Sequence, residues 1–268
     1  MVYFYIFIII QVVVESLPVS SSTHLMVAGT IATLLGGYYS DQYVLFMSQY
    51  GHHIAAIDHM LHGLTAIIVA LFFYPQCFFL LHNWRRCFFI ILKLLVLSGI
   101  ADTVTVCFFY LFKVYPFSVP LGYGLLITVG LLYSLKWCAL KGGRVFDYRS
   151  ALVLGCVQGL ALLPGISRFA IVYVASRWCG FDARKGLAVT WMIFWPLMVA
   201  ASAQGVYNLA REQVLFSLLT GGQVLLVIVG ATVLGYGAFC YAARCAYNNT
   251  FWQFSWYVAA LALLAICI

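Results

Sequence analysis

The chain has 268 residues, of which 65% are hydrophobic and 8% are charged, and its formal net charge is +7. Soluble domains are about half apolar and about a quarter charged, so this composition excludes a water-facing surface and predicts an all-α polytopic membrane protein. The Lys and Arg residues lie in short clusters between apolar runs, which excludes a nucleic-acid-binding face and favours contact with membrane lipid.

The first apolar segment, residues 1–36, is interrupted by a polar run that contains Glu15 and Pro18. Each half is too short to cross about 30 Å of hydrocarbon, so we expect a re-entrant helix–loop–helix hairpin that enters from outside. The alternative is a cleaved signal peptide, but the segment begins without Lys or Arg and has an acid where the cleavage region would lie. Three predicted spans follow, over residues 60–81, 94–112 and 119–135.

The second half repeats this order. Residues 150–176 are apolar and are broken around Pro164, which predicts a second re-entrant hairpin, entering from the cytoplasm. Three more predicted spans follow, over residues 186–205, 214–240 and 251–268. The positive-inside rule places three basic loops in the cytoplasm, namely 82–93, 136–149 and 177–185. The connections expected outside are residues 37–59, 113–118 and 206–213.

The two hairpins also match in sequence. Pro18 aligns with Pro164, Ser21 with Ser167, and a Gln lies shortly upstream of each break, at Gln11 and Gln158. We therefore predict an inverted-topology repeat within a single membrane domain, 1–268, with a first repeat over 1–140 and a second over 141–268. Such folds place their site near the membrane midplane, where the broken elements meet.

Each break carries an isolated charge. Glu15 is the only charged residue among the first forty, and Arg168 is the only one between Arg149 and Arg177. An ionisable side chain at membrane depth costs about 2.5 to 3.5 kcal/mol by insertion scales, which favours a functional role. A structural Glu15–Arg168 pair that locks the hairpins together is the alternative.

The residues around these charges suit a phosphate. Half-helix N-termini favour an anion, and the planar fork of Arg168 matches phosphate oxygens. Glu15 would repel an anion directly but could bind a divalent cation, Mg or Ca, together with Gln11 one turn earlier. His24 could transfer a proton at neutral pH. The remaining candidates for phosphate contacts are Ser20, Ser22, Gly165, Ser167 and Gln158.

These motifs resemble the bacterial undecaprenyl-diphosphate phosphatases, also called bacitracin-resistance proteins. Their first signature, Glu/Gln-x-x-x-Glu running into Leu-Pro-Val-Ser-Ser-x-x-His, is matched by Gln11 to His24. Their second, Pro-Gly-x-Ser-Arg-Ser-x-x-Thr, is matched by Pro164 to Arg168 but departs at Phe169 and Val172. Weaker similarity covers most of the chain.

The resemblance implies hydrolysis of a polyisoprenyl diphosphate to the monophosphate and inorganic phosphate, which recycles the lipid carrier of cell-wall synthesis. It implies a bacterial inner-membrane enzyme with a divalent metal and a site facing the periplasm. Carried over to this chain, Glu15 and Gln11 would serve the metal, Ser21 or His24 would be the nucleophile, and Arg168 would hold the phosphate. Because Phe169 and Val172 remove two hydroxyls, a lipid-phosphate carrier with little phosphatase activity is the alternative function.

Two questions stay open in the sequence. It does not decide whether the chain forms a homo-oligomer. It also contains a His-rich stretch with an Asp at an i, i+4 spacing, which we interpret as headgroup or structural contacts because metal ligation usually needs three or four convergent groups. The stretch comprises His52, His53, Asp58, His59 and His62.

Overall fold

The structure is a computed structural model that describes residues 2–117, 119–138, 143–214 and 222–267. Over these residues it contains helices and no strand, which confirms the predicted all-α class. Four helical runs are long and apolar enough to cross a membrane, namely Gly37–Phe72, Trp84–Val114, Ala183–Arg211 and Gly222–Tyr247. Together with the shorter apolar helices, they make the chain a multi-pass membrane protein.

The first predicted hairpin is a helix–break–helix unit. Helix α1 (Val2–Glu15) and helix α2 (Ser21–Leu35) are joined by five residues that include Pro18. Proline lacks an N–H donor and fixes its φ angle, so it favours a helix boundary here. Helix α2 ends where Gly36 adopts a φ of 63°, a left-handed conformation that glycine accepts without strain.

The rest of the first half differs from the prediction. The expected outer connection, 37–59, forms helix α3 (Gly37–Tyr50), the short helix η1 (Gly51–His53) and the start of helix α4 (Ile54–Phe72). The expected span 60–81 is not one helix, because α4 stops at Phe72 and helix α5 (Tyr74–His82) begins with Pro75 in its first turn. Helix α6 (Trp84–Val114) contains the next predicted span, 94–112, whereas helix α7 (Leu121–Ser134) is shorter at both ends than the predicted span 119–135.

The second half contains the second helix–break–helix unit, helix α8 (Tyr148–Leu160) and helix α9 (Arg168–Trp178). Helix α10 (Ala183–Arg211) covers the predicted span 186–205. Helix α12 (Gly222–Tyr247) runs seven residues beyond the predicted span 214–240, part of which lies outside the described residues. The last predicted span becomes two short elements, η3 (Phe251–Gln253) and α13 (Phe254–Cys267), with residue 268 outside the description.

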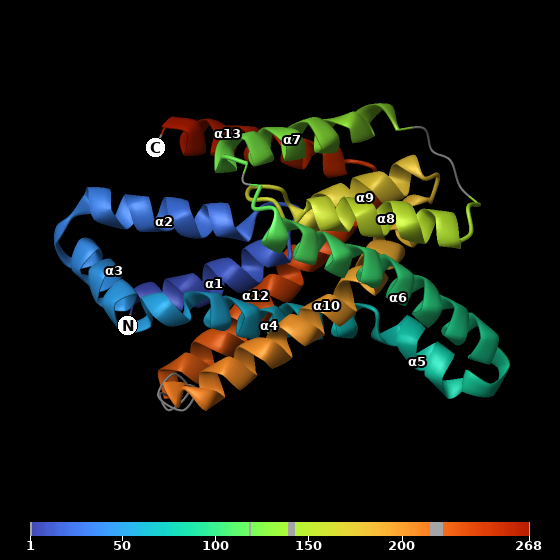
Figure 1. The fold of residues 1–268 in the computed structure, drawn as a ribbon, viewed down its shortest axis with the longest axis horizontal. Helices are drawn as coiled ribbons and strands as arrows, with labels where there is room; N and C mark the ends of the chain where they lie inside the picture. Colours follow the sequence, from blue (N-terminus) through green and yellow to red (C-terminus); the bar gives the residue numbers. More distant parts are fainter. Residues whose placement is uncertain (1, 118, 139–142, 215–221, 268) are drawn as a thin grey trace.

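The helices pair in a reciprocal pattern. Helix α1 packs against α12, and α8 packs against α6, while α4 packs along α10 and α7 along α13. Figure 1 shows α7 and α13 side by side at one edge of the molecule, with the α5–α6 unit projecting at the opposite edge. The breaks of the two helix–break–helix units lie near the centre, where they meet.

A proline inside α10 is compensated by a neighbouring helix. Pro196 has no N–H to donate, so the carbonyl of Met192, four residues earlier, loses its helical partner. The hydroxyl of Ser98 on α6 donates to that carbonyl at 3.0 Å. Proline is tolerated in membrane helices where a neighbouring side chain supplies the missing hydrogen bond in this way. The contact fixes α6 against α10.

Candidate active site

The two breaks line one cavity of about 190 Å³. The first break contributes Leu17, Val19 and Ser20 beside Glu15 and Ser21, and the second contributes residues 161–169. Residues more than 140 positions apart in the chain therefore share one site. The lining combines hydroxyls and the guanidinium of Arg168, which suit a bound phosphate, with two carboxylates, which suit a cation bound beside it.

Glu15 and Ser21 face each other across the first break. Glu15 is the last residue of α1 and Ser21 is the first residue of α2. The Ser21 hydroxyl donates to Oε2 of Glu15 at 2.8 Å. A serine hydroxyl is a weak nucleophile unless a neighbouring base accepts its proton. The carboxylate of Glu15 is placed to do so.

Arg168 begins α9 on the opposite side of the cavity. Its guanidinium carbon lies 5.1 Å from the ring centroid of Phe194, and its Nε is buried without a hydrogen-bond partner. The charges of Glu15 and Asp58 lie close enough to interact with Arg168. Within the described part of the chain, however, no ion pair joins Arg168 to either carboxylate. The alternative of a structural Glu15–Arg168 ion pair is therefore not formed, and the guanidinium is available to an anion.

The second break is held in place by α7. The backbone N–H of Ser167 donates to the hydroxyl of Thr128 at 3.2 Å, and the Ser167 hydroxyl caps α9 by accepting from the N–H of Ala170 at 3.4 Å. Gly165 has a φ of 81°, and a Cβ at this position would overlap the carbonyl oxygen of Leu121. The break therefore requires glycine. Gly165 and Ser167 both line the cavity, as predicted, although the Ser167 side chain already serves as a helix cap.

Two cavity residues were not predicted to belong to the site. Asp58 and His62 lie one turn apart on α4 and line the cavity with Glu15 and Ser21. His62 is 8% exposed, and its Nδ1 is buried without a hydrogen-bond partner. Their i, i+4 spacing puts them on one helix face. Sequence alone does not show that this face turns towards the two breaks.

His24 does not line the cavity. Its Nδ1 lies 2.7 Å from the carbonyl oxygen of Ser20, and its Nε2 lies 2.6 Å from the hydroxyl of Tyr257. A carbonyl oxygen only accepts, so the neutral ring carries its proton on Nδ1 and accepts from Tyr257 at Nε2. Both ring nitrogens of His24 are therefore engaged outside the cavity.

Two other predicted residues, Gln11 and Gln158, also lie apart from the cavity lining. Gln11 is 1% exposed, and both polar atoms of its amide lack a partner. Gln158 is buried, donates to the carbonyl of Ile193 at 3.5 Å and contacts Asp102 on α6. Ser22 lies within α2, but its side chain falls outside the described part of the structure.

The donors of the cavity fit a divalent cation that binds together with phosphate. Among the described residues, no group of three His, Cys, Asp or Glu side chains could hold a metal alone. However, the carboxylates of Glu15 and Asp58 line the same cavity and interact through their charges. Mg²⁺ is usually held by one or two carboxylates plus substrate phosphates. The unpaired amide oxygen of Gln11 lies one helical turn from Glu15.

Residues 4–264 match the family described as "Bacitracin resistance protein BacA". The chain belongs to the BacA family.

The relatives are similar over nearly their whole length. The undecaprenyl-diphosphatase of Pelotomaculum thermopropionicum is 24% identical over 281 residues, which cover 96% of this chain and 93% of the relative. The undecaprenyl-diphosphatase of Halothermothrix orenii is 26% identical over 268 residues, covering 97% of this chain and 95% of the relative. The undecaprenyl-diphosphatase of Geobacter metallireducens is 26% identical over 265 residues, which cover 92% of this chain and 90% of the relative.

This BacA-family chain has apolar residues at two positions where the second signature has hydroxyls. Phe169 is buried, and its ring lies 4.7 Å from that of Trp191 and 6.4 Å from that of Phe239. Val172, on α9, is buried in a core to which α6, α8 and α10 also contribute. Both side chains fill packed space, so the substitutions leave no hole, and Arg168 and Ser167 remain at the cavity.

Proposed function

We propose that this chain hydrolyses undecaprenyl diphosphate to undecaprenyl monophosphate and inorganic phosphate at the cavity between the two breaks. The observation that carries the proposal is the 2.8 Å hydrogen bond from Ser21 to Glu15 in a cavity that Arg168 also lines. Nucleophile, base and anion-binding group are the parts that hydrolysis of a phosphoanhydride needs. Membership of the BacA family and the undecaprenyl-diphosphatase names of its relatives support the same reaction.

The reaction proceeds through two displacements at the terminal phosphorus. The Ser21 oxygen attacks this phosphorus while Glu15 takes the Ser21 proton, and the bond to the bridging oxygen breaks to release the lipid monophosphate. A water molecule then attacks the phosphoserine, and the bond between phosphorus and Ser21 breaks as Glu15 returns its proton. Inorganic phosphate leaves with one water proton, and the other passes to solvent. Arg168 holds the phosphoryl oxygens during both displacements.

We propose that a divalent cation binds in the cavity beside the substrate phosphates. Glu15 and Asp58 would hold it from the cavity wall, with Gln11 one turn below Glu15. It would neutralise the negative charge that collects on the phosphoryl oxygens. One carboxylate has two oxygens, so Glu15 can accept the hydroxyl of Ser21 on one and serve a cation with the other.

Ser21 rather than His24 is the nucleophile in this proposal. Ser21 lines the cavity and is bonded to a base, whereas His24 uses both ring nitrogens elsewhere. Helix N-termini favour bound anions. Ser20, Gly165 and Ser167 line the cavity near the N-termini of α2 and α9, which supports their proposed role as phosphate contacts.

The membrane arrangement that we propose has six spans and two re-entrant hairpins in an inverted repeat. Helices α1 and α2 have 14 and 15 residues, and α8 and α9 have 13 and 11. At about 1.5 Å per residue, none of the four covers about 30 Å of hydrocarbon. Helices α7 and α13 have 14 residues each, and we count them as spans together with the adjoining short helices η2 (Leu135–Trp137) and η3. The reciprocal packing of α1 with α12 and of α8 with α6 supports the repeat. The protein would lie in the bacterial inner membrane with its cavity reached from the periplasmic side.

Phosphate release from undecaprenyl diphosphate tests this function. Purified protein in detergent should release phosphate, a chelator should suppress release, and Ser21→Ala should lose at least about 1,000-fold in rate. Thr30→Ala is the matched control, because its hydroxyl only bonds the carbonyl of Met26 within α2. Wild-type protein that binds the lipid but releases no phosphate would contradict the proposal and favour a lipid-phosphate carrier.

A further inference from the structure

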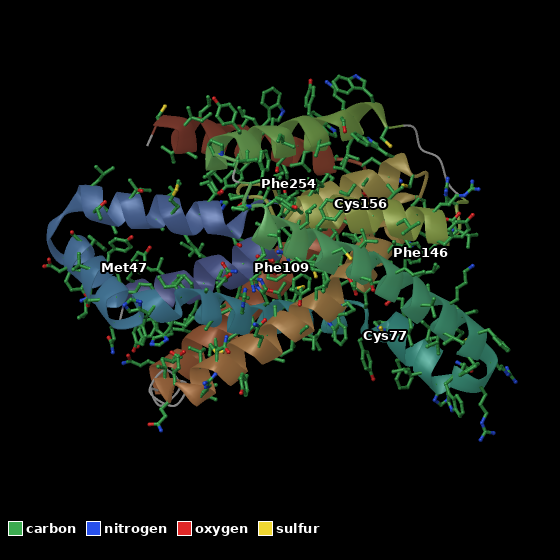
Figure 2. The ribbon with its side chains drawn as sticks, viewed as in Figure 1. Met47, Cys77, Phe109, Phe146, Cys156 and Phe254 are labelled. Carbon is green, nitrogen blue, oxygen red and sulfur yellow. The ribbon has the colours of Figure 1, made fainter. Side chains whose placement is uncertain are left out.

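A second cavity adjoins the phosphate cavity. Its volume is about 280 Å³, and its wall includes Leu17 and Val19 of the first break, which also line the phosphate cavity. Its other walls come from α12 and from the start of the last helical segment, and include Tyr241, Gln253, Phe254 and Tyr257. Figure 2 labels Phe254 near the centre of the molecule, close to the breaks. We call this space the tail cavity.

The tail cavity is built to receive hydrocarbon. Its walls are mainly aliphatic and aromatic side chains, and within the described residues none of its lining side chains is an acid or a base. A charged head would lose its hydration there without an ionic partner. Apolar surface that enters such a cavity is stabilised by about 25 cal/mol per Å² removed from water.

His24 links the first break to a wall of the tail cavity. Its ring lies 5.6 Å from that of Tyr257 in a stacked arrangement, and its Nε2 contacts the Tyr257 hydroxyl. The other ring nitrogen is tied to the first break through the carbonyl of Ser20. The imidazole thus connects the break that carries Ser21 to a wall of the tail cavity. This contact holds Tyr257 in position and explains why His24 is turned away from the phosphate cavity.

We propose that the tail cavity binds the isoprene units nearest the diphosphate, with His24 and Tyr257 as positioning residues. The inference rests on the proposed function, because it takes the substrate to be a lipid with a diphosphate head. A ligand with a charged head and an apolar chain requires a polar cavity and an apolar cavity in direct contact. Leu17 and Val19 line both cavities and therefore place them side by side.

A third cavity offers an internal control. Its volume is about 270 Å³, close to that of the tail cavity, and its lining includes Tyr3, Ile31 and Gln42. Among the described residues, its lining shares no member with the phosphate cavity. Membrane lipid could enter either apolar cavity equally, whereas the tail of a bound substrate reaches only the one that adjoins the phosphate cavity.

Matched substitutions distinguish a tail cavity occupied by the substrate from one occupied by membrane lipid. Gln253→Trp adds bulk to the tail cavity, and Gln42→Trp adds the same bulk to the third cavity. We expect Gln253→Trp to raise KM for farnesyl and undecaprenyl diphosphate at least about tenfold with little change in kcat. Its KM for methyl diphosphate, which carries no isoprene unit, should stay unchanged. Gln42→Trp should alter neither. The proposal would be overturned if Gln253→Trp and Gln42→Trp raised KM equally, or if Gln253→Trp raised KM equally for substrates with and without an isoprenoid chain.

Photo-crosslinking provides a readout that does not depend on turnover. p-Benzoylphenylalanine in place of Gln253 should capture radiolabelled undecaprenyl diphosphate, and unlabelled substrate should compete. The same group in place of Gln42 should show no competed capture. If the group at position 253 captures the labelled lipid, unlabelled substrate competes and the protein releases no phosphate, the tail site is supported and the phosphatase function is rejected. Phosphate release without competed capture at position 253 would reject the tail site alone.

Discussion

At the residue scale, the site is defined by which polar groups already have partners. Ser21 donates to Glu15, whereas Arg168 and His62 each keep a buried nitrogen without one. A buried polar atom without a partner costs about 1 to 3 kcal/mol, so such atoms indicate where a ligand completes the hydrogen bonding. Arg168 and His62 both line the cavity. We infer that a phosphate satisfies both.

His62→Gln is predicted to lower kcat/KM for undecaprenyl diphosphate about 10- to 100-fold. A hydrogen bond to a charged group contributes about 1.5 to 3 kcal/mol, and each 1.36 kcal/mol corresponds to a factor of ten in rate. Initial rates of phosphate release measure the effect, with His52→Gln in the exposed η1 turn as control. If His62→Gln kept full activity while His24→Gln lost most of its activity on methyl diphosphate, the phosphate contact would belong to His24 instead.

The sequence predicts one part of this residue set and misses another. Glu15 and Arg168 can be found because each is an isolated charge beside a proline break. Asp58 and His62 cannot be assigned from spacing, since their role depends on how α4 is rotated against the breaks. His24 was expected in the cavity because its imidazole could transfer a proton at neutral pH. Its actual partner, Tyr257, lies 233 positions away in the chain, and no local pattern indicates that contact.

At the element scale, close backbone approaches fix the second break against α7. A Cβ on Gly124 would overlap the carbonyl oxygen of Pro164, and one on Gly165 would overlap that of Leu121. Gly130, also in α7, has open space around its Cβ position. Gly124 and Gly130 therefore have different reasons to be present in α7, although the sequence pattern treats them alike.

Gly124→Ala is predicted to destabilise the protein by about 1 to 3 kcal/mol, because the added methyl overpacks the contact with the second break. Gly130→Ala should be neutral or stabilising by up to about 1 kcal/mol, since alanine favours a helix interior. Thermal unfolding in detergent compares the two. Equal unfolding midpoints would show that the α7 contact does not hold the break.

The helix boundaries show which element predictions follow from sequence. The two helix–break–helix units were predicted closely because proline and polar residues interrupt both apolar runs. The break at Phe73 was missed, although Pro75 follows it, because continuous hydrophobicity over 60–81 favoured a single span. Hydrophobic length detects membrane segments, but it does not locate turns within them.

At the scale of the whole molecule, the repeat predicts which connections share a side of the membrane. We expect Asn83 and Asn248 to face the cytoplasm and Gln213 to face the periplasm, as the positive-inside rule requires. Each can be replaced by cysteine in a variant without the nine native cysteines. A membrane-impermeant maleimide should label Gln213→Cys in intact cells and should label the other two only after permeabilisation. Labelling of all three in intact cells would contradict the inverted repeat.

The pairing of helices is the part of the fold that the sequence could not supply. Matching motifs indicate two related halves, but they do not show that α1 packs on α12 of the other half and α8 on α6. These long-range contacts bring the two breaks together, and with them Ser21 and Arg168. The site therefore exists only when both halves are assembled.

The central claim, that one phosphatase site is built across the two breaks, is tested most directly by a double-mutant cycle on phosphate release. Glu15→Gln and Arg168→Gln change one break each, and undecaprenyl diphosphate is the substrate. We predict that each single variant loses at least about 100-fold and that the double variant loses much less than the product, because residues acting on one phosphate are not additive. Near-wild-type release from either single variant would contradict a site shared by both breaks.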